Sequence, residues 1–492
     1  MQSNQTYRQL KCPVVDICGG CQIQHLPYEK QLDQKQKQVI HLLKSFGRVE
    51  PIIPMKDPYY YRNKIHATFQ TDRRNRIISG IYQSGTHKVV PIDSCLLHDQ
   101  RADKIIVSIR ELLKSFKMRP YNEDTRQGLL RHVLIRTGFE SGQIMVVLVL
   151  GTHVFPSRKN FVKALLEKHP EITTVVMNVN NKKTSMVLGD RETVLYGKGF
   201  IQDTLCGLKF RISPKSFYQV NPVQTDILYN KALDLANFKG NETIIDAYCG
   251  IGTIGLIASK RVKKVIGVEL NNDAFKDAIN NAKRNDIKNV FFHNADAGEF
   301  MIKSAKRKQF VDAVIMDPPR AGSSDDFIRA LAFMKPKKII YISCNPVTLK
   351  RDLEKLTRKG YEVKNMIPVD MFPGTHHVET VVLLSHKKAD THINVNVEFG
   401  EGEGKIPVGK IVEKAEDQRP SERVTYKMIQ EYIESKYDFK VHTAYIAEVK
   451  RDLGLPMYDA PNAVEELKHP RKNPTIEKVE AIKDALKHFR LL

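Results

Sequence analysis

The feature that most constrains the fold is the alternation of short apolar runs with amphipathic stretches from about residue 206 to 388. The runs have the length and β-branched content of buried strands, and intervening segments such as NDAFKDAINNAKRN have helical spacing. This alternation is typical of a parallel sheet covered by helices. The expected strands are ETIIDAY, KKVIGVEL, NVFFHNAD, VDAVIMD and KKIIYIS.

The rest of the chain divides around this region. YEVKNMIPVDMFPGTHHVETVVLLSH closes it with two strand-like runs and no helix, which predicts an antiparallel pair at one sheet edge. Upstream, residues 60–205 look mostly β, with QIMVVLVLG and ITTVVMNVN as strands and DKIIVSIRELLKSF as a helix. The expected divisions are a domain over 1–205, a domain over 206–388, a Gly- and Glu-rich linker over 389–403 and a C-terminal helical module over 404–492.

The last part of the chain has helical patterns. TYKMIQEYIESK and TAYIAEVKRDLG each begin at a threonine that can cap a helix, and the second ends at Gly454. TIEKVEAIKDALKHF repeats apolar residues at helical spacing. Such a module suits either a helix-turn-helix-like RNA binder or a packing or dimerisation element, and the pattern leaves these alternatives open.

The charge of the chain indicates a polyanionic partner. The formal net charge is +22, and lysines and arginines that neutralise phosphates release counterions. YYYRNKIHATFQ and GLLRHVLIRTG mix aromatic and basic residues, so Arg62, Lys64, Arg131 and His132 are candidate RNA contacts, with a solvated basic face as the alternative. No run reaches the roughly 18 apolar residues of a membrane span, and the polar start lacks a signal core. We expect a cytoplasmic monomer that does not bind membranes.

A glycine motif follows the first of the five expected strands. DAYCGIGTIGL places Gly250, Gly252 and Gly255 in a G-x-G-x-x-G pattern, which lets the chain turn tightly and a ligand approach the backbone. Glu269 ends the next strand, nineteen residues beyond Gly250, where a carboxylate can accept hydrogen bonds from ribose hydroxyls. The pair indicates an adenosine ligand. The antiparallel end of the sheet, and Asp317 in MDPPR at the carboxyl end of the fourth strand, favour S-adenosylmethionine over a dinucleotide.

A cysteine follows the fifth strand on the same sheet edge. Cys344, in YISCNPVTL, is therefore expected to face the sulfonium methyl group, whereas Cys206 and Cys249 are read as core residues. A thiol beside a methyl donor suits methylation of pyrimidine C5, because thiolate addition at C6 makes C5 nucleophilic. The adduct then needs a base to remove the C5 proton. Glu379 is the first candidate for this base, with His376 and His377 as rivals.

The motifs SFYQVNP, DAYCGIGTIG, DPPRAG, SCNP and HVETVVLL stand in the order seen in the RNA uridine-C5 methyltransferases. The chain resembles that family over about residues 12 to 386. The resemblance implies that Cys344 is the nucleophile and Glu379 the base. It also implies a class I S-adenosylmethionine methyltransferase domain, with an α/β, Rossmann-like fold. The implied cofactor-site residues are Gln219, Tyr248, Gly250, Gly252, Thr253, Glu269, Asp296 and Asp317, with Asp296 near the adenine and Thr253 standing where the family often has Asn.

Four cysteines lie outside the methyltransferase motifs. CPVVDICGGC holds Cys12, Cys18 and Cys21, and Cys95 lies in PIDSCLLH. Four thiolates suit zinc or a four-iron cluster, and the spacing leaves both open. The resemblance to the ribosomal branch of the family implies a [4Fe-4S] cluster. We therefore expect an N-terminal and central α+β iron–sulphur domain that shapes RNA binding.

Together these features predict an S-adenosylmethionine-dependent enzyme that forms 5-methyluridine in 23S rRNA. A tRNA T-loop uridine-C5 methyltransferase and a non-catalytic RNA-folding or assembly factor are the alternatives, and intact Cys344 and Glu379 argue against the last. Many family members carry an N-terminal RNA-binding β-barrel. Because eleven residues precede Cys12, we expect that barrel to be missing and the C-terminal module to be its substitute. The target uridine must also leave its stack to reach the thiol.

Overall fold

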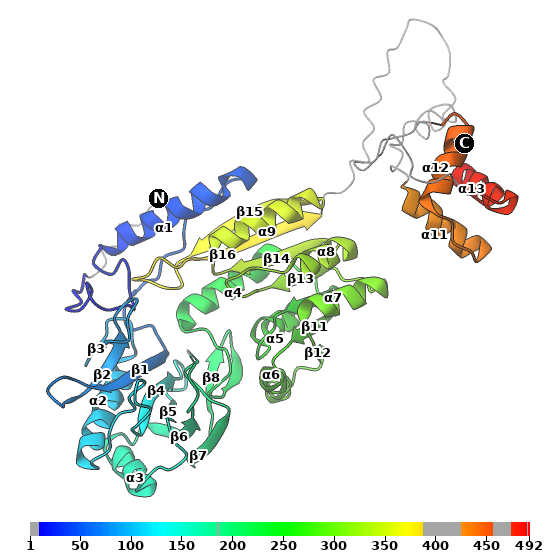
Figure 1. The fold of residues 1–492 in the computed structure, drawn as a ribbon. Helices are drawn as coiled ribbons and strands as arrows, with labels where there is room; N and C mark the ends of the chain where they lie inside the picture. Colours follow the sequence, from blue (N-terminus) through cyan, green and yellow to red (C-terminus); the bar gives the residue numbers. More distant parts are fainter. Residues whose placement is uncertain (1–8, 185, 387–424, 456–473, 490) are drawn as a thin grey trace, which may run out of the picture. The chain divides into compact units, whose positions relative to one another are not determined.

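The computed structural model describes residues 9–184, 186–386, 425–455, 474–489 and 491–492. It forms two compact units, residues 1–389 and 390–492 (Figure 1). The expected linker over 389–403 lies outside the described residues. Within the ranges given above, no helix has the length and apolar character needed to cross a membrane.

The first unit contains the expected parallel sheet. Its strand order is β12-β11-β10-β13-β14-β16-β15, and the first five of these strands run parallel. β16 is antiparallel to both neighbours, which confirms the predicted antiparallel pair at one edge. The strands are β10 (Thr243–Ala247), β11 (Lys264–Glu269), β12 (Val290–Asn294), β13 (Ala313–Met316), β14 (Lys338–Ser343), β15 (Tyr361–Val369) and β16 (Glu379–His386).

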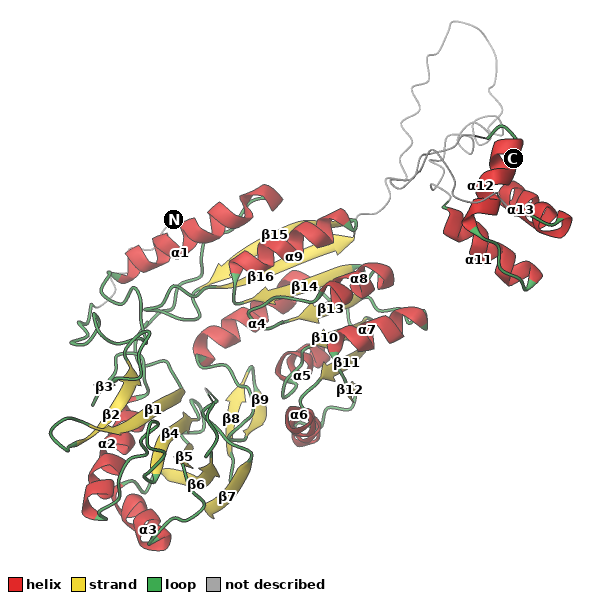
Figure 2. Cartoon of the chain, in the orientation of Figure 1, coloured by secondary structure: helices red, strands yellow, loops and turns green. Residues whose placement is uncertain are grey.

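Successive residues of these strands enter two different cores, as the two-residue period of a strand requires. Ile244 and Ile315 join one hydrophobic cluster, whereas Ile245 and Val314 join the other. Helices therefore cover both faces, and the strand order is the one that the resemblance predicts for a class I S-adenosylmethionine methyltransferase domain (Figure 2). The helices are α4 (Pro222–Ala236), α5 (Thr253–Ala258), α6 (Asn272–Arg284), α7 (Ala297–Lys306), α8 (Asp325–Met334) and α9 (Pro346–Arg358), with a 3-10 turn at Ser259–Arg261.

A second sheet of seven strands, ordered β3-β2-β1-β4-β5-β6-β7, precedes the first along the chain. Helices α2 (Gln100–Ser115) and α3 (Arg158–Lys168) pack on one face, while Leu134 and Val147 on the other face belong to the methyltransferase core. The strands are β1 (Lys64–Thr71), β2 (Ile77–Tyr82), β3 (Val89–Pro91), β4 (Leu130–Thr137), β5 (Ile144–Leu150), β6 (Ile172–Val179) and β7 (Arg191–Tyr196), followed by the hairpin β8 (Ile201–Leu205) and β9 (Leu208–Ile212).

The first helix packs on the sheet that follows the expected boundary at residue 205. α1 (Tyr28–Leu43), which continues into a 3-10 turn at Lys44–Phe46, contributes Val39 and Leu43 to the core of the methyltransferase sheet. The α1 side chains therefore stabilise the downstream sheet, although the helix precedes β1 in the chain. The division at residue 205 stays a prediction; α1 precedes it in the sequence but packs on the sheet that follows it.

The second unit has three helices in its described residues: α11 (Tyr426–Tyr437), α12 (Thr443–Asp452) and α13 (Ile476–His488). They enclose a small core that includes Ile429, Ile446 and Ile482. Thr425 caps α11 as expected, because its side chain accepts a hydrogen bond from Met428 N. The predicted cap of α12 at Thr443 is wrong, since the side chain of His442 accepts from Ala444 N instead.

Candidate active site

The glycine loop joins β10 to α5 at the carboxyl edge of the parallel strands. Gly250 and Gly252 have φ values of +57° and +83°, a region that glycine adopts without steric cost. Glu269, at the end of β11, accepts hydrogen bonds from Gly250 N at 2.9 Å and Asn271 N at 2.6 Å. The carboxylate is thereby fixed at the sheet edge, and its oxygens keep further lone pairs for hydroxyl donors.

Asp246, which the sequence interpretation missed, lies directly beneath this loop. Its Oδ2 accepts a hydrogen bond from Gly255 N at 2.7 Å, and its Oδ1 has no partner in the part of the chain that the structure describes. Burial raises the pKa of Asp246 to about 8. A Cβ at position 255 would lie 2.8 Å from Oδ2, so this close contact requires glycine. The signal in the sequence was an acidic residue inside an otherwise apolar strand.

Three polar side chains meet on the α4 side of the loop. Tyr229, also missed from the sequence, is buried, and burial raises the pKa of its hydroxyl while nearby Thr253 and Gln219 oppose that rise. Gln219 is buried as well, and its backbone carbonyl accepts from Asn63 Nδ2 at 3.1 Å. Thr253, the residue that departs from the family pattern, therefore lies close enough to Tyr229 to affect the pKa of its hydroxyl.

The remaining expected cofactor residues lie along the same edge. Tyr248 has a φ of +66°, and its ring centroid is 5.4 Å from that of Phe327. Asp296 is the N-cap of α7, where it accepts from Glu299 N at 3.0 Å. Asp317 directly follows β13, and burial raises the pKa of its carboxyl group to about 7.

Cys344 and Glu379 adjoin across the antiparallel pair of β14 and β16. The register pairs Ser343 with Thr380, so the next residue on β14 and the preceding residue on β16 are Cys344 and Glu379. Glu379 is only 3% exposed, and its Oε2 has no hydrogen-bond partner among the described residues. Burial raises the pKa of Cys344 to about 11, with further contributions from Glu379 and Asp317. Burial and the nearby Asp317 also hold the pKa of Glu379 well above its usual range.

Arg320 is a cation whose charge acts on both Cys344 and Glu379, and the sequence interpretation did not single it out. Its charge opposes the rise of the pKa of both Cys344 and Glu379. Its backbone carbonyl accepts from Asn345 Nδ2 at 3.1 Å and Thr348 Oγ1 at 3.2 Å. The loop after β13 is thus tied to the loop that carries the thiol. The arginine directly after Asp-Pro-Pro was the available signal.

The two histidines named as rival bases lie on the loop that precedes β16. His377 is half-buried, its ring makes an edge contact with Phe372, and burial with nearby Arg320 lowers its pKa. His376 is exposed. The strand register brings Glu379 directly opposite the thiol, which favours Glu379 over both histidines.

Helix α1 holds this loop, residues 370–378, in place. Lys35 Nζ lies 2.5 Å from Asp370 Oδ1, and both side chains are at most 1% exposed. Tyr28 donates to Asp370 Oδ2 at 2.7 Å, and Gln31 Oε1 accepts from Gly374 N at 2.8 Å. Burial lowers the pKa of Lys35, against the effect of Asp370. Side chains from the start of the chain therefore fix the segment that leads into Glu379.

The four N-terminal cysteines line one hollow of about 430 Å³. Burial raises the pKa of Cys21 to about 12, with added repulsion from Cys95, Cys18 and Cys12. Cys18 Sγ accepts from Gly20 N, and Cys95 Sγ from Leu97 N, each at 3.4 Å. Among the described residues no three His, Cys, Asp or Glu side chains are close enough to hold a single metal ion. The thiols thus share a cavity without forming a compact single-ion site.

The expected RNA contacts divide into two pairs. Arg62 and Lys64 line the cysteine hollow, and burial lowers the pKa of Lys64 to about 8. The prediction for Arg131 and His132 is wrong, because both are buried within β4. Arg131 pairs with Glu123 at 2.5 Å and donates to backbone carbonyls, and burial lowers the pKa of His132 to about 4.

Comparison with known proteins gives consistent matches. A family model described as tRNA (Uracil-5-)-methyltransferase matches residues 27–387. An RNA methyltransferase of Bacillus cereus is 42% identical over 391 residues, which cover 78% of this chain and 85% of the relative. One of Halalkalibacterium halodurans is 42% identical over 381 residues, covering 76% and 83%.

Among solved structures, the tRNA (uracil-54, C5)-methyltransferase of Pyrococcus abyssi, in complex with S-adenosyl-L-homocysteine, is similar to this chain. The TM-score is 0.63 and the identity 29%, over 75% of this chain and 86% of that one. The match over residues 27–387, the 42% identical relatives and the sheet topology agree with one another. The chain therefore belongs to the tRNA (uracil-5-)-methyltransferase family and is an S-adenosylmethionine-dependent RNA methyltransferase.

Proposed function

We propose that this chain methylates C5 of uridine in 23S rRNA, with Cys344 as nucleophile and Glu379 as base. The observation that carries the proposal is the strand register, which sets the thiol opposite a buried carboxylate whose Oε2 has no hydrogen-bond partner in the described part of the chain. A thiol and a carboxylate that adjoin at the carboxyl edge of a methyltransferase sheet suit a reaction that adds sulfur at one carbon and removes a proton from the next.

Cys344, once its thiol has lost its proton to solvent, adds through Sγ to C6 of the uracil, and the electron density gained by the ring makes C5 nucleophilic. S-adenosylmethionine, when bound, supplies the methyl group that C5 takes up. Glu379 then accepts the C5 proton, the bond between C6 and sulfur breaks, and 5-methyluridine leaves. The raised pKa of Glu379 makes its carboxylate a stronger base for this proton.

The proposed cofactor site follows the sheet edge from α4 to β13. Glu269 would bind the ribose hydroxyls, because strand and loop contacts hold its carboxylate at the end of β11. Asp296 is proposed to lie near the adenine. The further residues of the proposed site are Gln219, Tyr248, Gly250, Gly252, Thr253 and Asp317.

Cys12, Cys18, Cys21 and Cys95 are proposed to hold a [4Fe-4S] cluster. Four thiols around one hollow suit zinc as well as a cluster, and the resemblance to the ribosomal branch favours the cluster. Backbone N–H groups already point at two of the sulfurs, as they do around cluster thiolates. Chain purified without oxygen should contain iron and acid-labile sulfide in equal amounts, and Cys95→Ser should lose both.

The choice of 23S rRNA is supported by the cysteine set, which resembles the ribosomal branch. Similarity to the Pyrococcus abyssi tRNA enzyme favours the alternative, a tRNA T-loop uridine. Methyl transfer from labelled S-adenosylmethionine to separately purified 23S rRNA and tRNA transcripts tests the proposal. Activity confined to tRNA would overturn it.

Two variants test the roles of the catalytic pair on whichever RNA is methylated. Cys344→Ala should abolish methyl transfer. Glu379→Gln should let the covalent RNA adduct accumulate on a denaturing gel, because the C5 proton is no longer removed. Full activity of Cys344→Ala would contradict the assigned nucleophile, and loss of activity in both variants without any adduct in Glu379→Gln would contradict the assigned base.

A further inference from the structure

A groove of about 810 Å³ lies at the outer edge of the methyltransferase sheet, away from Cys344. β12 is the last strand on this side, and α6 and α7 flank it (Figure 1). Residues from both helices and from the two outermost strands line the groove. No contact in the proposed catalytic cycle uses this surface.

The charges of the groove have one sign. Lys264, Lys283, Lys303 and Arg307 line it, all four are exposed, and none of the described residues that line it is acidic. Lys303 shares its charge with Glu299 at 3.4 Å on the surface of α7. An exposed groove lined by cations on three elements concentrates positive potential for a polyanion.

Aromatic rings stand among these cations. Phe291 of β12 is 50% exposed, and Lys264 Nζ lies 4.9 Å from its ring centroid. The next residue, Phe292, also borders the groove, but it is less exposed and its ring packs against the glycine loop, where a Cβ at Gly252 would lie 3.0 Å from it. Phe291 therefore remains available at the surface, and an exposed ring beside cations is the combination that binds single-stranded nucleic acid.

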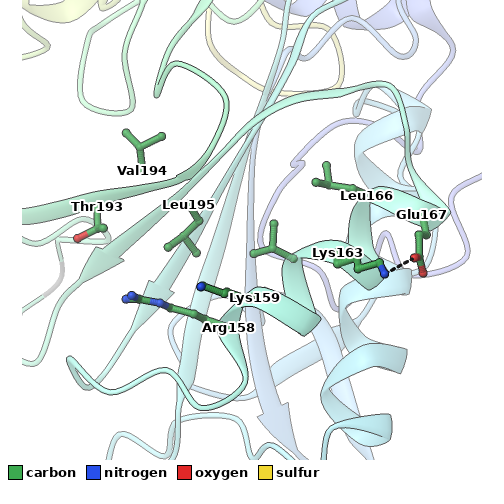
Figure 3. A pocket seen from close by; sticks show the side chains of 9 residues that line it. Arg158, Lys159, Lys163, Leu166, Glu167, Thr193, Val194 and Leu195 are labelled. Carbon is green, nitrogen blue, oxygen red and sulfur yellow. Dashed lines mark ion pairs between the residues drawn. The ribbon is translucent and has the colours of Figure 1, made fainter.

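A second basic hollow of the first unit provides a contrast. It lies between α3 and β7 and has a volume of about 580 Å³ (Figure 3). Arg158, Lys159 and Lys163 line it, but Lys163 pairs with Glu167 at 3.9 Å, and no aromatic side chain is among its described lining residues. Positive charge alone therefore does not distinguish the β12 groove from other surfaces of this chain. The combination of positive charge with an exposed aromatic ring distinguishes it from the hollow between α3 and β7.

We propose that the β12 groove binds the RNA substrate beside its methylated segment, by stacking a base on Phe291 and pairing phosphates with Lys264, Lys283, Lys303 and Arg307. β12 lies four strand positions from β14, which is roughly 19 Å across the sheet at about 4.8 Å per strand. The strand register sets Phe291 level with Ile339, five residues before Cys344, which adds about 17 Å along the strands and gives roughly 25 Å in all. A stacked strand at about 3.4 Å per nucleotide covers this distance in about seven or eight nucleotides. The proposal rests on the RNA methyltransferase activity and holds for either rRNA or tRNA as substrate.

Binding and turnover of variants of the full chain test the groove. The variants are Phe291→Ala, Phe291→Tyr, and the triple replacement of Lys283, Lys303 and Arg307 by Ala. The matched control is the triple replacement of Arg158, Lys159 and Lys163 by Ala, which removes the same charge from α3. Affinity is measured for labelled oligouridylate and for 23S rRNA and tRNA transcripts at several salt concentrations, and the maximal methylation rate is measured at saturating RNA.

Phe291→Ala should weaken binding about fivefold or more, because one stacked base is lost, and Phe291→Tyr should retain the affinity. The triple groove variant should reduce the slope of log affinity against log salt by about 2, which is three lost single-strand phosphate contacts, and the α3 control should keep the wild-type slope. The rate at saturating RNA should stay unchanged in all variants.

Equal weakening by the groove and α3 variants would overturn the proposal, since only total charge would then matter. Unchanged RNA affinity of Phe291→Ala would also overturn it. So would a dimer of the wild-type chain that Phe291→Ala dissociates while RNA binding is kept, because the β12 edge would then be a protein interface. A wild-type chain that methylates neither RNA would instead refute the proposed function, and the binding comparison is independent of that result.

Discussion

Replacing Lys35 by Met should show how strongly α1 holds the loop that leads into Glu379. Lys35 is 1% exposed and contacts Asp370 Oδ1 at 2.5 Å and the Phe372 carbonyl at 3.0 Å. Met fills a similar volume but leaves the Asp370 carboxylate buried, with the Tyr28 hydroxyl as its remaining side-chain donor. Breaking a buried ion pair by removing one partner costs about 3–5 kcal/mol of unfolding free energy.

The loss of stability should appear first in the segments that the Lys35–Asp370 ion pair connects. Hydrogen exchange should speed up in α1 and in residues 370–378, and the rate of methyl transfer should fall because Glu379 is less well positioned. Binding of S-adenosylmethionine should stay near the wild-type level, since the glycine loop lies on other strands. The double variant Lys35→Met/Asp370→Asn should recover much of the stability, because no uncompensated charge remains.

A matched control lies two residues away on the same helix. Lys37 pairs with Asp33 at 2.8 Å, but its side chain is 73% exposed, so Lys37→Met should change the unfolding free energy by less than about 1 kcal/mol. The reasoning fails if Lys35→Met is no more destabilising than Lys37→Met. It also fails if the double variant is as unstable as Lys35→Met alone.

Three further predictions concern the site itself. Because the pKa of Cys344 is raised to about 11, the rate of its alkylation by iodoacetamide in the free chain should rise about tenfold per pH unit from pH 7 to 10. Mass spectrometry of the peptide that contains Cys344 measures this rate, and a rate that levels off near pH 8 would contradict the prediction. The folded-state pKa of Asp246, about 8, exceeds its unfolded value of about 3.9, so the contribution of Asp246 to stability is lost as the pH rises between these two values. The melting temperature of the wild type should therefore fall relative to that of Asp246→Asn from pH 5 to pH 8. A constant difference between the two melting temperatures over this range would refute the assignment. Gly252→Ala should weaken S-adenosylmethionine binding in calorimetry, because the added Cβ would lie 3.0 Å from the Phe292 ring within the glycine loop. Gly240→Ala is the matched control: its φ of +95° imposes similar backbone strain, but nothing lies within 4 Å of its Cβ and it is outside the loop, so binding should be kept.

The periodicity of apolar residues in the sequence was sufficient to predict the sheet that carries the candidate site. Five apolar runs became parallel strands, and the helix-free end became the antiparallel pair. The sequence interpretation assigned roles to residues at the carboxyl ends of the expected strands, and it therefore identified Glu269, Asp317 and Cys344 as candidate site residues. The functional roles of these residues remain predictions, but their placement at one edge follows directly from strand direction.

What the sequence could not show depends on contacts between distant segments. Lys35 and Asp370 are 335 positions apart, and no local pattern marks them as partners. Arg131 and His132 looked like exposed basic residues, yet β4 is an interior strand with both faces covered. Buried charge is possible there because Glu123 and backbone carbonyls satisfy the guanidinium, which periodicity does not reveal.

The direction of β16 determines how the N-terminal segment reaches the proposed catalytic pair. If β16 ran parallel to β14, its first residue would lie at the opposite edge, about 20 Å from Cys344 for a strand of this length. Because it runs antiparallel, and β15 runs the other way again, the connection over residues 370–378 must cross the edge that holds the thiol. The α1 side chains and Ile23, whose N–H donates to Gly374 O, bind this connection. The segment after Cys21 therefore contacts the same connection that leads into Glu379.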